Sequence, residues 1–217
     1  MKHPEMNIDI IGKKLVNCEY HCAGVTNNPA EGILPRCLIF EDRPGVKGSI
    51  VVGLNPGKAK KPEKKFYLKN KNTYNAVKKY WDVKVKHIKY YSQLREILST
   101  LGFNGPILWT DLAKCQCSDE YRYVPIQSMR ICINKYLRKE IGLFPKYTIF
   151  GVGNTSFEFC ALSFPKHFVI GIPHPTGSYG NFSRLMKNIN ENKQKYIERI
   201  ENRKDRNGKY MALKIFE

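Results

Sequence analysis

The sequence predicts an α/β fold, a three-layer sandwich with a central, mainly parallel four-stranded sheet flanked by helices. Three observations support this class. Four short runs are apolar throughout, as in parallel strands buried on both faces: 48–54, 106–110, 146–152 and 168–172. Segments with helical spacing of apolar residues lie between or after these runs. The length of 217 residues suits one sizeable core, so we expect a single domain over 1–217.

Helix signals support this order of elements. The stretch 90–103 places Leu94, Ile97 and Leu98 on one face and stops before a Gly. The stretch 125–142 begins with Pro125 and ends with Gly142, which are favoured helix boundaries. A short helix is predicted over 154–163, capped by Asn154, and a fourth over 183–204. The segment 1–47 reads as an N-terminal wrap with a possible edge strand at 36–42, and 203–217 as a tail or a docking strand.

Charge indicates the kind of partner. Thirty-seven Lys and Arg against nineteen Asp and Glu give a formal charge of +18, in a chain that is 42% hydrophobic. This combination predicts a folded protein with a polyanionic partner, nucleic acid first and an anionic membrane surface second. An AT-rich genome would also raise the lysine content, but it would not explain where the lysines sit. The first residues are charged and no window is apolar enough for a membrane span, so we expect a soluble, intracellular protein of the cytoplasm or nucleoid.

Candidate site residues follow the predicted strands. Ligands of parallel sheets bind beyond the carboxyl ends of the strands, which brings "GLNPG", "WTDLAKC", "GVGN" and "GIPHPTGSYG" to one edge. In the first motif, Gly53 and Gly57 permit close backbone approach, and Asn55 can hold a water molecule or a polar ligand atom. In the last, His174 on a proline-rich loop can donate a hydrogen bond to charge that develops on a bound base.

A lysine-rich stretch follows the first motif. Residues 58–90 contain twelve lysines and two acids, interleaved with six aromatic residues. Lysines neutralise phosphates and aromatic rings stack on bases, so the stretch predicts a nucleic-acid face. The alternative is a solvated basic helix whose aromatic residues face the core.

The cysteines suggest a metal centre. In a reducing compartment the seven cysteines read as metal ligands or core thiols. Cys18 and Cys22 precede the core, and Cys115 and Cys132 follow much later, so four thiolates can converge on a four-iron–four-sulfur cluster or on tetrahedral zinc. Cys117 is a possible substitute ligand. Cys37 and Cys160 read as core residues.

Taken together, these motifs resemble the uracil-DNA glycosylase superfamily, and in particular its iron–sulfur branch. "GLNPG" is similar to the first motif in the version used by mismatch-specific uracil/thymine glycosylases, and "HPTG" resembles the second motif. "WTDLAKC" followed by "VPIQSMRIC" resembles the segment that carries the third and fourth cluster cysteines. The likeness runs from about 18 to 184 and lies in the order and spacing of four motifs.

The resemblance implies a role for each matching position. Asn55 would orient the attacking water, and His174 would stabilise the departing base anion. Further positions are implied as cluster ligands (Cys18, Cys22, Cys115, Cys132), as the base pocket (Gly53, Leu54, Phe66, Tyr67, Asp111), as the wedge inserted into the duplex (Ser178, Tyr179) and as DNA-backbone contacts (Lys58, Lys60, Lys61, Arg184).

Three positions depart from the family pattern. The first cysteine pair is spaced C-x3-C where the branch has C-x2-C. Leu54-Asn55 offers no carboxylate, as in the mismatch-specific branch. Asp111 stands where the family often has an asparagine that reads uracil. An ionised Asp111 only accepts hydrogen bonds, so it suits a base with an amino group, is protonated in a dry pocket, or caps Lys114 or a backbone amide.

The sequence thus predicts a monofunctional DNA glycosylase that hydrolyses the N-glycosidic bond of a damaged or mismatched base, uracil or a relative, with DNA as its partner and no membrane. Two alternatives are a non-catalytic nucleic-acid-binding protein that keeps the fold and the cluster, and a zinc-stapled RNA-binding module.

Overall fold

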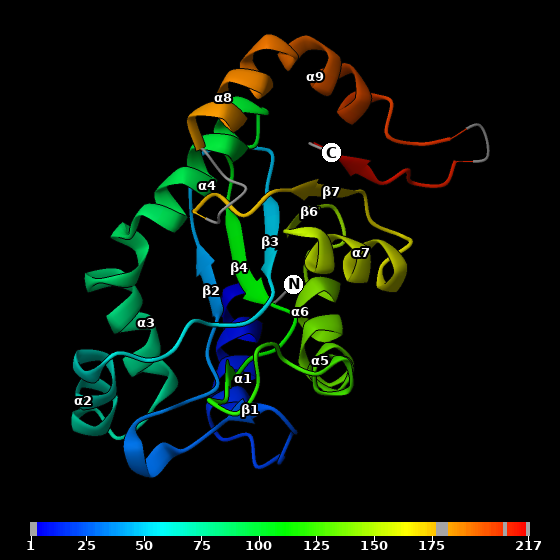
Figure 1. Ribbon diagram of the computed structural model, residues 1–217. Helices are drawn as coiled ribbons and strands as arrows, with labels where there is room; N and C mark the ends of the chain where they lie inside the picture. Colours follow the sequence, from blue (N-terminus) through cyan, green and yellow to red (C-terminus); the bar gives the residue numbers. More distant parts are fainter. Residues whose placement is uncertain (1–3, 177–181, 206–207, 216–217) are drawn as a thin grey trace. The chain divides into compact units, whose positions relative to one another are not determined.

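The computed structural model describes residues 4–176, 182–205 and 208–215 of the chain. The four apolar runs form strands as predicted (Figure 1), and every residue of these strands is buried. These strands are β3 (Ser49–Gly53), β4 (Ile107–Asp111), β6 (Thr148–Val152) and β7 (Val169–Ile172). Burial of both faces explains why they are apolar throughout rather than alternating.

The main sheet is larger than the predicted four strands. Among the described residues it has six, in the order β2-β4-β3-β6-β7-β8, with β2 (Leu38–Glu41) and β8 (Leu213–Lys214) at its edges. The pairs β3–β6, β6–β7 and β7–β8 are parallel. The α/β class is therefore confirmed and the strand number was wrong, because β8 is too short to leave an apolar run.

Two segments whose structure the sequence left open, 36–42 and 203–217, contribute strands to this sheet. The predicted edge strand at 36–42 contains β2. The C-terminal segment docks on the sheet, since Leu213 pairs with Ile170 of β7 and Ile215 N donates to Gly171 O at 2.8 Å. The alternative of a free tail is thus wrong for residues 213–215.

The chain forms two compact units. The first unit contains Met1–Phe40, Gly53–Val85 and Trp109–Pro145, and the second contains Glu41–Val52, Lys86–Leu108 and Lys146–Glu217. The chain passes from one unit to the other within β2, β3 and β4, between Val85 and Lys86, and between Pro145 and Lys146. The expectation of one domain over 1–217 stays a prediction.

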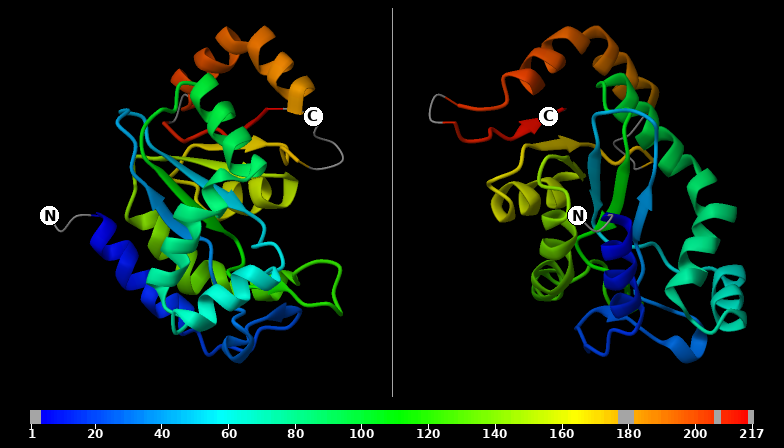
Figure 2. Two further views of the ribbon diagram at one scale, coloured as in Figure 1. Left: turned by 90° about the vertical axis from the view of Figure 1, so that its left-hand side faces the viewer. Right: turned by 180° about the vertical axis from the view of Figure 1, so that it is seen from behind.

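In the first unit, the segment expected to be a wrap begins with a helix, α1 (Pro4–Val16), which packs against α3 (Tyr74–Val83) (Figure 2). Gly12 makes this packing possible, since a Cβ there would lie 2.3 Å from the Tyr74 ring. Lys78 Nζ also lies 2.8 Å from Asp9 Oδ1. The short helix η1 (Pro29–Glu31) and α2 (Lys61–Lys69) complete this part of the unit.

The cysteine-bearing part of the first unit is built from short elements. β1 (Val25–Thr26) pairs antiparallel with β5 (Gln116–Cys117). The predicted helix 125–142 consists of α5 (Ile126–Cys132), the π-helix η3 (Ile133–Leu137) and α6 (Arg138–Gly142). Its predicted limits were nearly correct, but the change to π-helical bonding was not expected.

In the second unit, α4 (Lys89–Thr100) follows the short helix η2 (Val85–His87), and α7 (Asn154–Ser163) packs on β6 and β7. The N-cap of α7 is Gly153, with φ 82°, rather than the predicted Asn154. A glycine is needed there because this backbone conformation is strained for other residues. The predicted helix 183–204 is two helices, α8 (Phe182–Glu191) and α9 (Lys193–Glu201), which meet at Asn192.

No helix within residues 4–176, 182–205 and 208–215 is both long and apolar enough to cross a membrane.

Candidate functional site

The Asn-Pro-Gly turn begins where β3 ends. Its backbone runs beside the residues after β4, because Leu112 N donates to Gly53 O at 2.9 Å and Ala113 N donates to Leu54 O at 3.0 Å. The Asn55 side chain is half-buried, and its Nδ2 donates to Pro56 O at 3.0 Å. The turn thus presents one carboxamide at the carboxyl end of a buried strand, as predicted from the sequence.

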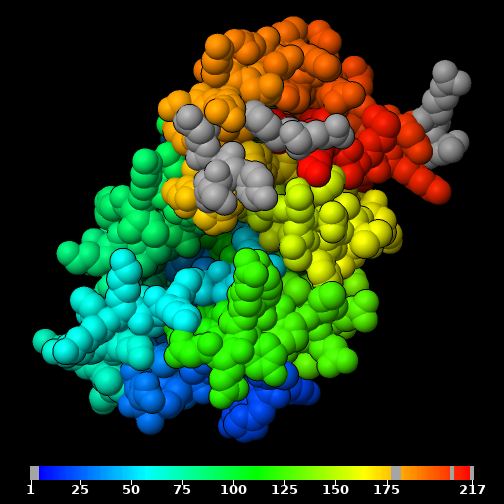
Figure 3. All heavy atoms as spheres, viewed as in Figure 1, coloured from blue at the N-terminus to red at the C-terminus, as the bar shows by residue number. Residues whose placement is uncertain are grey.

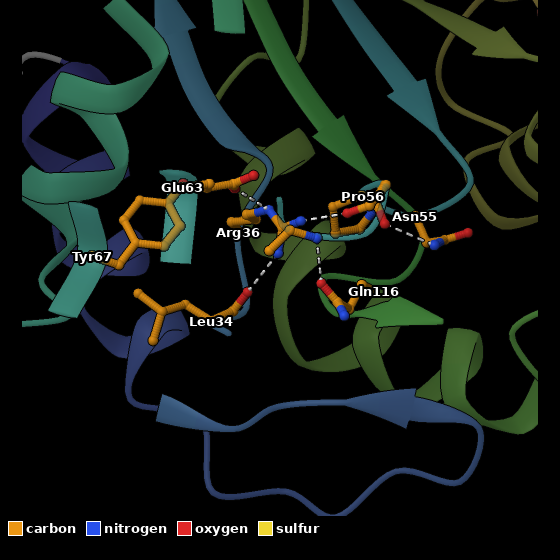
Figure 4. A network of polar contacts seen from close by, with 9 residues as sticks. Leu34, Arg36, Asn55, Pro56, Glu63, Tyr67 and Gln116 are labelled. Atoms are coloured by element: carbon orange, nitrogen blue, oxygen red, sulfur yellow. Dashed lines mark hydrogen bonds and ion pairs between the residues drawn. The ribbon is translucent and has the colours of Figure 1, made fainter. Parts of the chain in front are cut away.

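A buried arginine holds this turn in place (Figure 4). The Arg36 side chain is 8% exposed, and its guanidinium donates to Gly57 O, to Leu34 O and to Glu63. The Nε–Oε1 distance to Glu63 is 2.9 Å. On the other side of the turn, Gln116 Oε1 accepts from Ala59 N at 2.8 Å. The sequence analysis missed Arg36 and Gln116; a single arginine inside the apolar run "LPRCLIF" was the available signal.

The two aromatic rings predicted for the base pocket differ in accessibility. Tyr67 is 1% exposed and donates its hydroxyl to Glu63 Oε1 at 3.0 Å, whereas Phe66 is half-buried. Both rings pack with Tyr80, at centroid distances of 5.3 Å from Phe66 and 5.6 Å from Tyr67. Of the two, only Phe66 offers ring surface toward solvent, so Tyr67 belongs to the packing between α2 and α3.

Asp111 is buried at the end of β4. Its carboxylate accepts a hydrogen bond from the Cys37 thiol, and Oδ2 has no partner within the described parts of the chain. Burial raises the pKa of Asp111 to about 6, although the Cys37 hydrogen bond and the charges of Lys114 and Arg36 oppose this rise. Cys37 has φ 65°, a left-handed conformation that few non-glycine residues adopt. Burial also raises the pKa of the Cys37 thiol, so it is a neutral donor.

Lys114, which follows β4, is paired elsewhere. Its Nζ lies 2.7 Å from Glu140 Oε2 and also donates to Thr110 Oγ1, with side-chain exposures of 1% for Lys114 and 0% for Glu140. Asp111 therefore does not cap the Lys114 amine. The sequence analysis did not predict the Lys114–Glu140 pair.

The four predicted metal ligands gather in the first unit. Burial raises the pKa of the Cys115 thiol, and the neighbouring thiols of Cys132, Cys18 and Cys22 raise it further. The pKa of Cys22 is raised by burial and then by Cys132 and Cys18. In the described residues, however, no group of three or more His, Cys, Asp or Glu side chains is arranged to hold a metal ion. The thiols of Cys132, Cys18 and Cys22 thus lie near enough to Cys115 to raise its pKa.

Two further groups donate hydrogen bonds to these thiols. The Lys114 backbone N–H donates to the sulfur of Cys132, and the Tyr136 hydroxyl donates to the sulfur of Cys18. Tyr136 lies on the π-helix that begins directly after Cys132. Such hydrogen bonds to sulfur are typical of the surroundings of metal-bound thiolates.

The remaining cysteines separate into two kinds. Cys117 is half-buried and its thiol donates to Tyr121 O at 3.2 Å. Cys160 is fully buried on α7, as expected for a core residue. Cys37 is the partner of Asp111, a polar role that the core assignment did not include.

His174 lies in the second unit, two residues after β7. Its imidazole stacks at a tilt on Tyr90, with ring centroids 5.0 Å apart. Thr176 N donates to Nδ1 at 3.4 Å, an arrangement that places the proton of the neutral ring on Nε2. Partial burial lowers the pKa of His174, so the neutral form prevails at neutral pH. The ring therefore offers one N–H donor.

The predicted DNA contacts are exposed cations. In the first unit, Lys61 begins α2 and Lys58 and Lys60 lie just before it, and Arg184 lies on α8 in the second. Lys58 forms an ion pair with Asp119, which brings the cyan segment before α2 next to the green segment after β5 on the face seen in Figure 3. The predicted wedge residues Ser178 and Tyr179 lie outside the described residues.

The structure thus brings the Asn55 turn, Asp111 and the four thiols into one unit, and describes His174 with Tyr90 in the other. No known family model and no curated protein matches this sequence.

Proposed function

We propose that the protein is a monofunctional DNA glycosylase that hydrolyses the N-glycosidic bond of a damaged or mismatched base. The observation that carries the proposal is the Asn55 turn, which is held at the carboxyl end of a buried parallel strand by a buried arginine. Ligand sites of parallel sheets lie at this end of the strands. The motif order shared with the uracil-DNA glycosylase superfamily gives the reaction class, and the three-layer arrangement of that family stays a prediction.

The reaction requires little from the protein. A base extruded from the duplex leaves C1′ with the electron pair of the broken C–N bond, and a water oxygen forms the new bond to C1′. The Asn55 carboxamide would orient this water by accepting from it. The water proton then passes to solvent, because Leu54-Asn55 provides no carboxylate to take it. Catalysis by positioning alone predicts a slow enzyme.

His174 would act on the leaving group. Its Nε2–H is free of the Thr176 contact and can donate to the oxygen on which negative charge develops in a pyrimidine-type base. A neutral imidazole suits this task because it stabilises the anion without having to transfer a proton. The proposal requires Asn55 and His174 to face the same base, and a crystal of the protein with free uracil bound would test that requirement.

The thiols of Cys18, Cys22, Cys115 and Cys132 would hold a four-iron–four-sulfur cluster, with zinc as the alternative. The all-thiol donor set fits either. The resemblance to the iron–sulfur branch of the superfamily favours the cluster over zinc. When bound, the group would staple three chain segments together and take no part in bond breaking.

DNA would be held by the lysines at the start of α2 and by Arg184. Their exposed side chains neutralise phosphates, which makes binding strongly dependent on salt. Phe66, with ring surface open to solvent, would stack on the extruded base. Asp111 has one oxygen without a described partner and would favour a base with an amino group when ionised.

A panel of duplexes that contain U, T mismatched with G, hypoxanthine or other lesions tests this proposal. We expect abasic sites with the wild-type protein on at least one substrate, and their loss in Asn55→Ala at unchanged DNA affinity. Binding without base release by both proteins would instead support a non-catalytic nucleic-acid-binding protein. A colourless zinc protein with a preference for RNA would support the RNA-binding alternative.

A further inference from the structure

Arg36 joins its own segment to two distant parts of the first unit, residues 57–63 and Lys114. Its guanidinium donates to Glu63 on α2, to Gly57 O in the Asn55 turn and to Leu34 O in its own segment (Figure 4). Its backbone N donates to Lys114 O at 2.8 Å. An arginine can make these contacts at once because its planar group carries several donors in fixed directions.

The turn is held on both sides of Asn55. Before it, Leu54 O accepts from the backbone that follows β4. After it, Arg36 donates to Gly57 O and Gln116 Oε1 accepts from Ala59 N. A Cβ at Gly57 would meet no atom within 4 Å, so the turn is not packed from that side. Arg36 thus holds the end of the turn that lies two residues after Asn55, and a change in Arg36 should move that end.

The same arginine also reaches the lysine-bearing helix. Glu63 lies in the first turn of α2, two residues after Lys61, and its side chain is 12% exposed. A buried ion pair of this kind is sensitive to geometry, because a misplaced partner leaves a charge without compensation. The helix that carries the predicted phosphate contacts and the turn that carries Asn55 are therefore held by one side chain.

We propose that Arg36 is a positioning residue, which aligns Asn55 with the extruded base. Through its ion pair with Glu63, it also couples the position of the Asn55 turn to the position of α2. The inference rests on the proposed function for its catalytic consequence. Its structural consequence, the fixed position of residues 55–59, is independent of any reaction.

Arg36→Lys is the decisive variant, because lysine keeps the positive charge near Glu63 but lacks the planar group that also reaches Gly57 O. We expect single-turnover base release to fall by about 10²-fold, as for a displaced catalytic group, while the Kd for the same duplex changes by less than about 3-fold. Amide hydrogen exchange over residues 57–59, measured without DNA, should rise at least about tenfold, with exchange in β3 unchanged.

Arg95→Lys is the matched control. Arg95 also pairs with a carboxylate, Glu41, at 2.7 Å and donates to a backbone oxygen, Lys86 O, at 2.8 Å, but it lies in the second unit. We expect it to leave both the exchange of residues 57–59 and the rate of base release as in the wild type. If Arg36→Lys does not fold, Glu63→Gln weakens the same ion pair with an isosteric side chain and should give the same pattern at smaller amplitude.

The outcomes separate the two proposals. Unchanged exchange over residues 57–59 in Arg36→Lys would overturn the positioning role, whatever the protein does to DNA. Raised exchange with an unchanged rate would overturn it as well, since the turn would then be mobile without consequence. Absence of base release by the wild type, with raised exchange in the variant, would reject the glycosylase and keep the structural part of the inference.

Discussion

Lys114 and Glu140 form an ion pair inside the first unit, with Nζ 2.7 Å from Oε2 and both side chains almost completely buried. Glu140 Oε1 has no partner within the described residues. A pair of this kind contributes little net stability, but removal of one partner leaves a buried charge without compensation.

Glu140→Leu should therefore lower the free energy of unfolding by about 3–5 kcal/mol, and the double variant Lys114→Met/Glu140→Leu should regain most of this loss. Urea denaturation at neutral pH measures both. Glu191→Gln is the control, because Glu191 pairs with Lys187 at 3.8 Å on the surface and should change stability by less than about 1 kcal/mol. A double variant as unstable as the single one would contradict the prediction.

Asp111 should make stability depend on pH. Burial raises its pKa to about 6 from the ordinary 3.8, so the folded state holds this proton more tightly than the unfolded state. The resulting stabilisation is complete below about pH 4 and is lost as the pH rises through about 6, a change of up to about 3 kcal/mol. In Asp111→Asn this loss should disappear, as measured by urea denaturation at several pH values. The control variant Asp119→Asn, which changes an exposed carboxylate, should keep the pH-dependent loss of stability. If the free energy of unfolding of Asp111→Asn changed with pH as in the wild type, Asp111 would not be its source.

The proposed metal centre should depend on Cys132 and not on Cys117. Cys132→Ser removes one of the four mutually close thiols and should abolish metal binding, measured as iron, sulfide and zinc content together with visible absorbance. Cys117→Ser keeps the donor to Tyr121 O and should retain the metal. A brown protein indicates iron–sulfur and a colourless one zinc. Equal metal content in both variants would show that the ligand set is different.

The Tyr90 ring should control the titration of His174. The two rings are 5.0 Å apart, and partial burial lowers the pKa of His174. Tyr90→Ala admits water to the imidazole, so its pKa should rise toward the ordinary value in an NMR titration. His167, whose pKa burial also lowers, serves as the internal control and should not move. A His174 pKa unaffected by Tyr90→Ala would mean that other groups exclude the water.

DNA binding should weaken when Lys60 and Lys61 are lost. If each lysine neutralises one phosphate, the double alanine variant should reduce the slope of log K against log salt by about 2. Fluorescence anisotropy with a labelled duplex at several salt concentrations measures the slope. Lys13→Ala/Lys14→Ala removes two exposed lysines at the end of α1 and should leave it unchanged. If the slope of log K against log salt were equal for the two double variants, Lys60 and Lys61 would not belong to a specific DNA-binding face.

The sequence predicted those parts of the fold whose signal is local. β3, β4, β6 and β7 were predicted because burial on both faces makes them apolar throughout. The helix α1 was not, because Gly12 interrupts its helical pattern and is explained only by the close approach of Tyr74 from another helix. The two-residue strand β8 exists through its pairing with β7 and has no pattern of its own.

The candidate site divides in the same way. The Asn55 turn and the cysteines were predicted because they carry motifs, whereas Arg36 and Glu63 are 27 positions apart and no local rule joins them. The burial of Tyr67 likewise depends on Tyr80 and Glu63, which come close only in the folded helices. Side chains that hold functional groups in place are thus the ones that sequence patterns miss.

The π-helix over Ile133–Leu137 has a consequence for insertions and deletions. It winds one more residue per turn into the helix than an α-helix does, directly after Cys132. Removal of one residue would restore ordinary winding and leave the later side chains close to their present orientation, because the residue removed is the extra one that the π-helix accommodates. Leu137 and Ile141 would then keep their places in the core. A one-residue deletion in this stretch should therefore do less damage than the same deletion inside α4, where it would rotate every later side chain by about 100°.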